Sequence, residues 1–161
     1  MKDEYPNSKS DLFAAFIERC TSLARPHGAA AMITMQSWMF LSSYEKLRTS
    51  LLSHQQITSM LHLGTRAFDS IDGEVVSSTA FVLTNPPAGR TNHEGMFIRL
   101  VDEASEAEKA AALSTAISVR TKDAGYYLAS GHDFTAIPGS PIVYWLSKKM
   151  RGAFSSGQPL G

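Results

Sequence analysis

The sequence of 161 residues is short of three things that often restrict what a protein does. Its single cysteine, Cys20, excludes an intrachain disulfide and a zinc site built from cysteines. Its 15 Lys and Arg residues balance its 15 Asp and Glu residues, so it has no excess of positive charge that would predict the main contact with the phosphates of a nucleic acid. No apolar run approaches the ~20 residues of a transmembrane helix, and we expect no membrane contact.

What is present fits a globular protein. Hydrophobic residues make up 43% of the chain and charged residues 19%, which is enough apolar material for one domain with a buried core. Residues 1–9 are polar and acidic, unlike a signal peptide, and predict a cytoplasmic location. No two of the five histidines lie three or four residues apart, so we predict no local metal site.

The N-terminal quarter indicates a helix followed by a strand. Apolar side chains recur there at helical spacing after a cap at Ser10 or Asp11, and we expect their face to be buried. The members of this face are Leu12, Phe16, Cys20 and Leu23, with Phe13 and Ile17 at its border. The run Ala29–Met35 is apolar without alternation, which favours a parallel strand covered on both faces.

The remaining chain predicts more elements of both kinds. They are a helix over Tyr44–Ser53, strands over Ile57–Leu63, Ser77–Thr84 and Met96–Val101, and an alanine-rich helix over Ser105–Val119. We expect the third and fourth of the chain's strands to pair as a hairpin across the turn-rich loop Asn85–Gly95. Residues 120–134 and the tail Arg151–Gly161 show no regular pattern, and Ile142–Leu146 fits a strand or a helix.

This order of elements resembles the C-terminal half of the sheet of class I (Rossmann-like) methyltransferases. The resemblance implies an α/β fold of three αβα layers, with an extra hairpin strand and helix. Ala29–Met35, Ile57–Leu63 and Ser77–Thr84 correspond to the fifth, sixth and seventh strands of that sheet. In that fold the seventh strand runs antiparallel and lies between its two predecessors.

Four stretches carry a closer resemblance: SDLFAAFIERC, MITMQSWMFLSSYEKLR, HLGTRAFDSIDGEVVSSTAFVL and IPGSPIVYW. They resemble the N6-adenine DNA methyltransferases of BREX-type (PglX-like) phage-defence systems, which are also grouped with type II restriction–modification enzymes. The resemblance implies transfer of a methyl group from S-adenosylmethionine to an adenine flipped out of duplex DNA. The partner of the whole protein is then duplex DNA.

Three residues take roles by this resemblance. Leu12 and Phe16 match the motif whose apolar side chains border the adenine of S-adenosylmethionine, and Phe68 matches the aromatic residue that stacks on the flipped base. A flipped base needs such a platform because stacking returns roughly 1–3 kcal/mol of the cost of unstacking. For all three the alternative is packing: Leu12 and Phe16 in the helix core, and Phe68 as a plug beneath its own loop.

Two motifs of the family are missing: the glycine-rich cofactor loop and the catalytic Asn-Pro-Pro-Tyr. We therefore expect a fragment that lies C-terminal to that tetrapeptide, carries no catalytic residue, binds no S-adenosylmethionine alone and is inactive alone. The run Asn85-Pro86-Pro87-Ala88 lacks the aromatic residue and follows the wrong strand, so we interpret it as a turn.

The C-terminal part carries a small basic group, Lys148, Lys149 and Arg151, beside Tyr144 and Trp145. These cations are the candidates for contact with the DNA backbone, with surface solubility as the alternative. We expect residues 1–124 to belong to the catalytic domain and residues 125–161 to be a junction, partly irregular, toward the target-recognition region.

A function of another class also fits the sequence. The chain can be a non-catalytic protein-interaction module of a defence complex that binds its partner through an exposed sheet edge. An unpaired apolar edge of this kind also predicts self-association.

Overall fold

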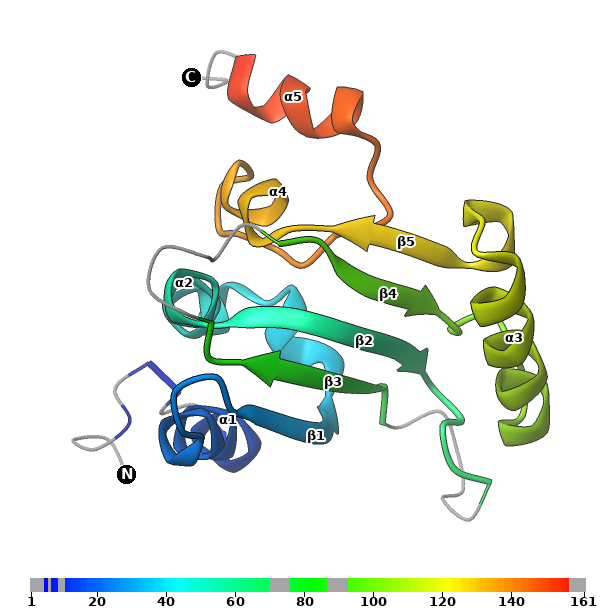
Figure 1. The fold of residues 1–161 in the computed structure, drawn as a ribbon, viewed down its shortest axis with the longest axis horizontal. Coiled ribbons are helices and arrows are strands. Elements are labelled where there is room, and N and C mark those ends of the chain that lie inside the picture. The colour runs from blue at the N-terminus through cyan, green and yellow to red at the C-terminus, as the bar shows by residue number, and fades with distance from the viewer. Residues whose placement is uncertain (1–4, 6, 9–10, 70–75, 87–92, 157–161) are drawn as a thin grey trace.

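The fold is taken from a computed structural model that describes residues 5, 7–8, 11–69, 76–86 and 93–156. Helices and strands alternate along most of this chain (Figure 1). The helices are α1 (Leu12–Leu23), α2 (Glu45–His54), α3 (Glu106–Val119), α4 (Gly131–Thr135) and α5 (Lys148–Ser156), with 3-10 turns at Gln36–Met39, Ser42–Tyr44 and Lys122–Ala124. The strands are β1 (Ala29–Met35), β2 (Gln56–Gly64), β3 (Ser78–Thr84), β4 (Gly95–Arg99) and β5 (Tyr126–Ala129).

The five strands form one sheet in the order β1-β3-β2-β4-β5. Strand β3 runs antiparallel to both β1 and β2, β2 runs parallel to β4, and β5 runs antiparallel to β4. Thus β1, β2 and β4 point in one direction, and their carboxyl ends meet at one edge. The predicted α/β fold is confirmed, including a third strand that lies antiparallel between its two predecessors.

Two details of the strand predictions are wrong. The first strand is not covered on both faces, because its burial alternates and its only strand neighbour in the described chain, β3, is antiparallel. The fourth strand does not form a hairpin with the third, because both edges of β3 are already occupied. It pairs instead with β2, in parallel. Gly95 permits this approach, since a Cβ at that position would lie 2.0 Å from the Ile57 carbonyl oxygen.

Three elements form where no regular pattern was visible in the sequence: β5, α4 and α5. Strand β5 is short and gains its order by pairing with β4. Helix α4 starts with a capping box, in which the Ser130 backbone N–H donates to the Asp133 carboxylate at 2.8 Å. Residues 142–146 form neither the strand nor the helix that their composition allows.

The main core lies on the sheet face covered by α1, α2 and α4. Its largest fully buried side chains include Trp38, Phe97 and Phe134, and Trp38 meets Phe81 edge-to-face with ring centroids 5.1 Å apart. A smaller cluster lies on the opposite face, where α3 packs through Ala116 against Ile98 and Leu100. The helices therefore cover the two faces unequally.

Helix α1 buries a different face from the predicted one. Its buried residues are Ala14, Ala15, Ile17 and Thr21, whereas Leu12, Phe16 and Leu23 are 57%, 51% and 65% exposed. Small side chains at the contact allow the helix to lie close to the sheet. Asp11 is the N-cap residue by position, but its side chain makes no capping hydrogen bond, and Ser10 lies outside the described residues.

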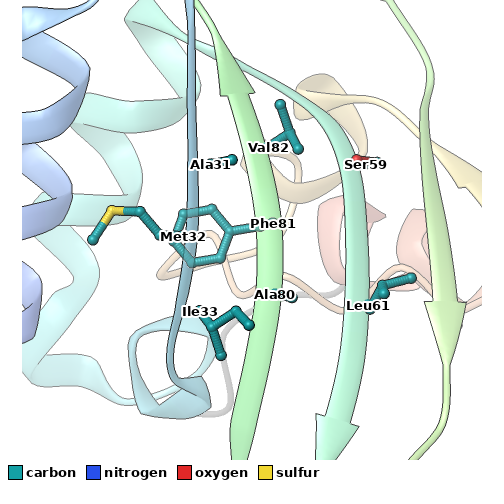
Figure 2. A pocket seen from close by; sticks show the side chains of 8 residues that line it. All are labelled: Ala31, Met32, Ile33, Ser59, Leu61, Ala80, Phe81 and Val82. Atoms are coloured by element: carbon teal, nitrogen blue, oxygen red, sulfur yellow. The ribbon is translucent and has the colours of Figure 1, made fainter. Parts of the chain in front are cut away.

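On the sheet face that α3 packs against, about half of the surface has no helix over it within the described chain. This open face is formed by β1, β3 and the middle of β2, and Figure 2 shows the side chains that line its shallow hollow. Six of the eight side chains labelled in Figure 2 form two rows across the strands: Ala31, Val82 and Ser59 in one row, and Ile33, Ala80 and Leu61 in the next. Large and small side chains alternate in both rows, and Ile33 is 58% exposed.

Candidate functional site

The carboxyl ends of β1, β2 and β4 bring three polar side chains to one edge of the sheet. Gln36 follows β1 directly, His62 lies near the end of β2, and Arg99 ends β4 beside His62 in the parallel register. Ligands of open α/β sheets bind outside this edge, because the loops there are free to diverge. The carboxyl edge is therefore the candidate functional site.

His62 is buried, with 4% of its surface exposed, and both of its ring nitrogens are occupied. Nε2 lies 2.8 Å from the Gln36 side-chain oxygen, and Nδ1 lies 3.0 Å from the Tyr144 hydroxyl. Since the amide oxygen can only accept, Nε2 carries the proton and Nδ1 accepts from Tyr144. Burial, aided by the positive charge of Arg99, lowers the pKa of His62 to about 4, so the ring is neutral at pH 7.

Aromatic rings surround this hydrogen-bonded chain. Trp145 stacks on the His62 ring with centroids 5.9 Å apart, and Phe40 meets Trp145 edge-to-face at 5.8 Å. The Arg99 guanidinium carbon lies 5.6 Å from the centre of the Trp145 ring, within range of a cation–π interaction. Tyr144 stacks on Phe97, and burial raises the pKa of its hydroxyl, which stays protonated.

Arg48 is a buried cation that ties the nearby loops together. Its Nη1 donates to the carbonyl oxygens of Trp38 and Leu41 at 2.9 and 2.7 Å, and its Nε and Nη2 donate to that of Gly139 at 3.0 and 2.7 Å. Only 1% of the residue is exposed, and burial lowers its pKa. Arg48 was not among the residues predicted from the sequence. The available signal was a charged residue next to the inward Leu47 of α2.

The residues expected to line a cofactor pocket are exposed. Leu12 and Phe16 lie four residues apart on α1, on the surface that does not contact the sheet. The alternative prediction, that Leu12 and Phe16 are buried where α1 packs on the sheet, is therefore wrong. Two exposed apolar side chains on adjacent helical turns can form one wall of a pocket for a flat apolar ring.

Phe68 lies in the loop after β2, close to the carboxyl edge, and is 38% exposed. The next residue fixes this loop to α3: the Glu106 backbone N–H donates to the Asp69 carboxylate at 3.1 Å. The reverse contact, from the Asp69 N–H to the Glu106 carboxylate, measures 3.4 Å. The ring is thus partly open to solvent on an anchored loop.

The three basic residues of the C-terminal helix have different surroundings. Arg151 is buried, and its Nη2 lies 3.1 Å from the Asp133 carboxylate of α4. Lys149 is exposed, and the side chain of Lys148 is outside the described part. Solvent therefore reaches Lys149, whereas the guanidinium of Arg151 takes part in an internal ion pair.

The structure accounts for Asn85 without catalysis. Its side-chain amide donates to the carbonyl oxygen of Ala24 at 2.9 Å, where α1 ends. Its backbone N–H also donates to the carbonyl oxygen of Gly28, between α1 and β1, at 2.9 Å. Asn85 therefore caps the end of α1, whereas Pro87 and Ala88 of the predicted turn lie outside the described residues.

Two other classes of site are missing from the described residues. His, Cys, Asp and Glu side chains form no group of three there that could hold a metal ion. No described helix is both long enough and apolar enough to cross a membrane. The polar and aromatic groups of the carboxyl edge thus remain the main candidate site.

Curated proteins similar to this chain share a common description. This chain is 42% identical over 164 aligned residues to an "Adenine-specific methyltransferase BrxX" of Escherichia coli O9:H4 (strain HS), and the alignment covers 99% of this chain. It is 48% identical over 146 residues to an "Adenine-specific methyltransferase PglX" of Lacticaseibacillus casei (strain Zhang), which covers 90% of it. The chain spans 12% of the length of each relative. Residues 1–68 also match the family of Eco57I restriction-modification methylases.

Solved structures support the fold. A type I restriction–modification methyltransferase subunit from Streptococcus thermophilus superposes with a TM-score of 0.52 at 19% identity, covering 73% of this chain and 26% of that one. A modification subunit of a putative type I restriction enzyme from Vibrio vulnificus gives a TM-score of 0.51 at 14% identity, covering 76% and 27%. These likenesses show a common sheet architecture.

Proposed function

Because this chain belongs to the family of adenine-specific methyltransferases that includes BrxX and PglX, we propose that it is one section of the catalytic domain of such an enzyme. The complete protein is proposed to methylate adenine N6 at specific sites in duplex DNA, in a restriction–modification or phage-defence system of the cytoplasm. The observation that carries the proposal is 42–48% identity over almost the whole chain.

The reaction assigns distinct tasks to different parts of the enzyme. In the complete enzyme S-adenosylmethionine would supply the methyl group: the amino nitrogen of a flipped adenine would bond to the methyl carbon as its bond to sulfur breaks, S-adenosylhomocysteine would leave, and the amino group would then lose a proton. We assign the residues of this chain to binding and not to that bond exchange. Leu12 and Phe16 offer an apolar wall for the cofactor's adenine, and their exposure on α1 supports this assignment.

Phe68 is proposed to stack on the flipped base. Its partial exposure and its anchored loop near the carboxyl edge support this assignment. Lys148 and Lys149 are proposed to contact the DNA backbone, while Arg151 acts by holding α5 to α4. We retain residues 1–124 as catalytic domain and 125–161 as the junction to target recognition, although β5 of the junction joins the same sheet.

A segment exchange tests this function. In the L. casei PglX, this chain replaces the 48% identical segment, and transfer of labelled methyl groups to adenine in DNA is measured. We expect the chimera to be active and a PglX lacking the segment to be inactive. A folded chimera that binds S-adenosylmethionine and DNA but transfers no methyl group contradicts the proposal.

Two further measurements assign the residues. Phe68→Ala in the chimera is expected to lower kcat/KM by roughly ten- to a hundredfold, because stacking contributes ~1–3 kcal/mol per base. Phe154→Ala, at an exposed ring of α5, is the matched control and should have a smaller effect. For the isolated chain, calorimetric titration with S-adenosylmethionine should give no binding tighter than millimolar, and micromolar affinity would contradict the fragment assignment.

The second candidate function is a protein-interaction module of a defence complex. The observation that favours it is strand β1, which has no second strand neighbour in the described chain and borders the apolar open face. Such an edge invites pairing with another chain. An inactive chimera, together with stable self-association of the isolated chain, would favour this function.

A further inference from the structure

The segment between α4 and α5 has little secondary structure to hold it, yet parts of it are as buried as the core. Ile142 is 0% exposed and Tyr144 is 2% exposed, although residues 141–143 form no helix, strand or turn. Its order must therefore come from separate contacts to the rest of the fold. Three such contacts occur in sequence along it.

The first two contacts fix the segment to the loop after β1. The Gly139 carbonyl oxygen accepts two hydrogen bonds from Arg48, which also binds Trp38 and Leu41 of that loop. The Ile142 backbone N–H donates to the carbonyl oxygen of Met39 at 2.9 Å. Both contacts use backbone groups of the segment and therefore depend little on its side-chain identity.

The third contact is the hydrogen-bonded chain from Tyr144 through His62 to Gln36. It is set among aromatic rings, where a phenylalanine at position 144 could fill the same space against Phe97. Replacing two buried hydrogen-bonding partners by apolar groups of similar shape is often neutral for stability. The polar chain instead selects one arrangement, because any shift of the segment leaves buried polar atoms unpaired.

The third contact also places the residues that come directly after it. Trp145 is adjacent to Tyr144, stacks on His62 and lies within reach of Phe40 and Arg99. Ser147 then caps α5, its hydroxyl accepting from the Met150 N–H at 3.2 Å. Two contacts therefore set the direction of α5. One is the aromatic network around Trp145, and the other is the ion pair between Arg151 and Asp133.

We propose that Tyr144, His62 and Gln36 form a positioning latch that fixes Trp145 and the start of α5 against the carboxyl ends of β1, β2 and β4. In the complete enzyme, and resting on the function proposed above, the latch orients the basic start of α5 toward DNA bound at that edge. Its members are positioning residues and take no part in methyl transfer.

The first test uses the 161-residue chain and does not depend on function. Tyr144→Phe is expected to raise amide hydrogen exchange in residues 142–151 at least tenfold while leaving α1, β1 and β3 unchanged. Because the chain has two tryptophans, 5-fluorotryptophan labelling gives two fluorine NMR signals. The signal of Trp145 should shift and that of Trp38 should not. Tyr126→Phe, the same substitution on the opposite sheet face, is the control.

A double variant separates positioning from stability. The double variant Tyr144→Phe/His62→Leu removes both Nδ1 and the hydroxyl, and the half-buried Gln36 side chain can bond to water in place of His62. We therefore expect the melting temperature to recover toward that of the unmodified chain. Exchange in residues 142–151 should stay high. Exchange within twofold of the unmodified chain in both variants would overturn the latch. If Tyr144→Phe does not fold, His62→Gln replaces it in the test. The glutamine side chain can still bond to both Gln36 and Tyr144, so this variant should fold with low exchange in residues 142–151. Failure of both variants to fold would show that the network only stabilises the fold and would overturn the positioning role.

The second test uses the segment-exchanged PglX. Tyr144→Phe is expected to raise the KM for DNA at least tenfold, with kcat and the affinity for S-adenosylmethionine within about twofold of the parent chimera. A fall in kcat alone would overturn the orienting role. If the parent chimera is inactive, the proposed function fails, and the exchange measurements still decide whether the latch exists.

Discussion

The two faces of the sheet differ in how completely the chain covers them. One face lies beneath α1, α2 and α4 and includes Trp38 and Phe97, both fully buried. The β1–β3 half of the other face has no helix over it in the described chain, and Ile33 is 58% exposed there. A sheet of α/β type normally carries helices on both faces. The covered face therefore stabilises this chain, and the open face is suited to contact something else.

The largest difference between the faces should appear in stability. Phe97→Ala removes a ring from the covered face and is expected to cost about 3–5 kcal/mol. Ile33→Ala is expected to cost less than about 1 kcal/mol, since its side chain already meets solvent. Denaturant unfolding at pH 7 measures both changes. Similar losses from the two variants would show that the open face is packed in solution.

Replacement of Arg48, the buried cation on the covered face, should give the next largest loss of stability. Arg48→Met leaves the carbonyl oxygens of Trp38, Leu41 and Gly139 without these donors, at an expected cost of about 2–4 kcal/mol. Arg48→Lys should recover only part of this, because one ammonium cannot reproduce the planar fork of the guanidinium. The control is Arg19→Met at an exposed position of α1. Denaturant midpoints that match for the two methionine variants would contradict the prediction.

The buried histidine makes the stability of the covered side depend on pH. The pKa of His62 in the folded chain, about 4, lies below its ordinary value, so the unfolded chain binds more protons between these values. Stability should thus rise with pH between about 4 and 6.5, by at most about 3 kcal/mol, and be fully present above that range.

Unfolding curves across this range test the contribution of His62. His62→Gln should flatten the dependence, because the variant has no imidazole at this buried position. An equal slope in the unmodified chain and in His62→Gln would assign the dependence to other groups.

The smallest expected effect concerns the open face itself. If the chain self-associates through β1 and this face, Ile33→Lys should weaken association about tenfold, because a charge on an edge strand opposes pairing. Leu128→Lys, at a similarly exposed position on the opposite edge strand β5, is the control. Sedimentation velocity at several concentrations measures both, and equal effects would exclude β1 as the contact.

Elements that depend on local chemistry could be predicted from the sequence. Strand β1 has the predicted bounds, Ala29–Met35, because its apolar run starts directly after Pro26-His27-Gly28 and is therefore defined locally. Helix α3 begins after Ser105, whose side chain accepts from the Glu108 N–H. The resemblance to methyltransferases also anticipated the family and the antiparallel third strand, since the motif order carries that information.

The tertiary structure alone decided which surfaces meet. Strand β4 pairs with β2 because β3 has no free edge, and α1 turns Leu12 and Phe16 outward because Ala14 and Ala15 allow closer packing. His62, Gln36 and Tyr144 are far apart in the sequence and become partners only when the carboxyl edge forms. Local patterns set how each segment folds, because they act between neighbours in the chain. Pairing, burial and the polar network depend on contacts between distant residues, which no local pattern specifies.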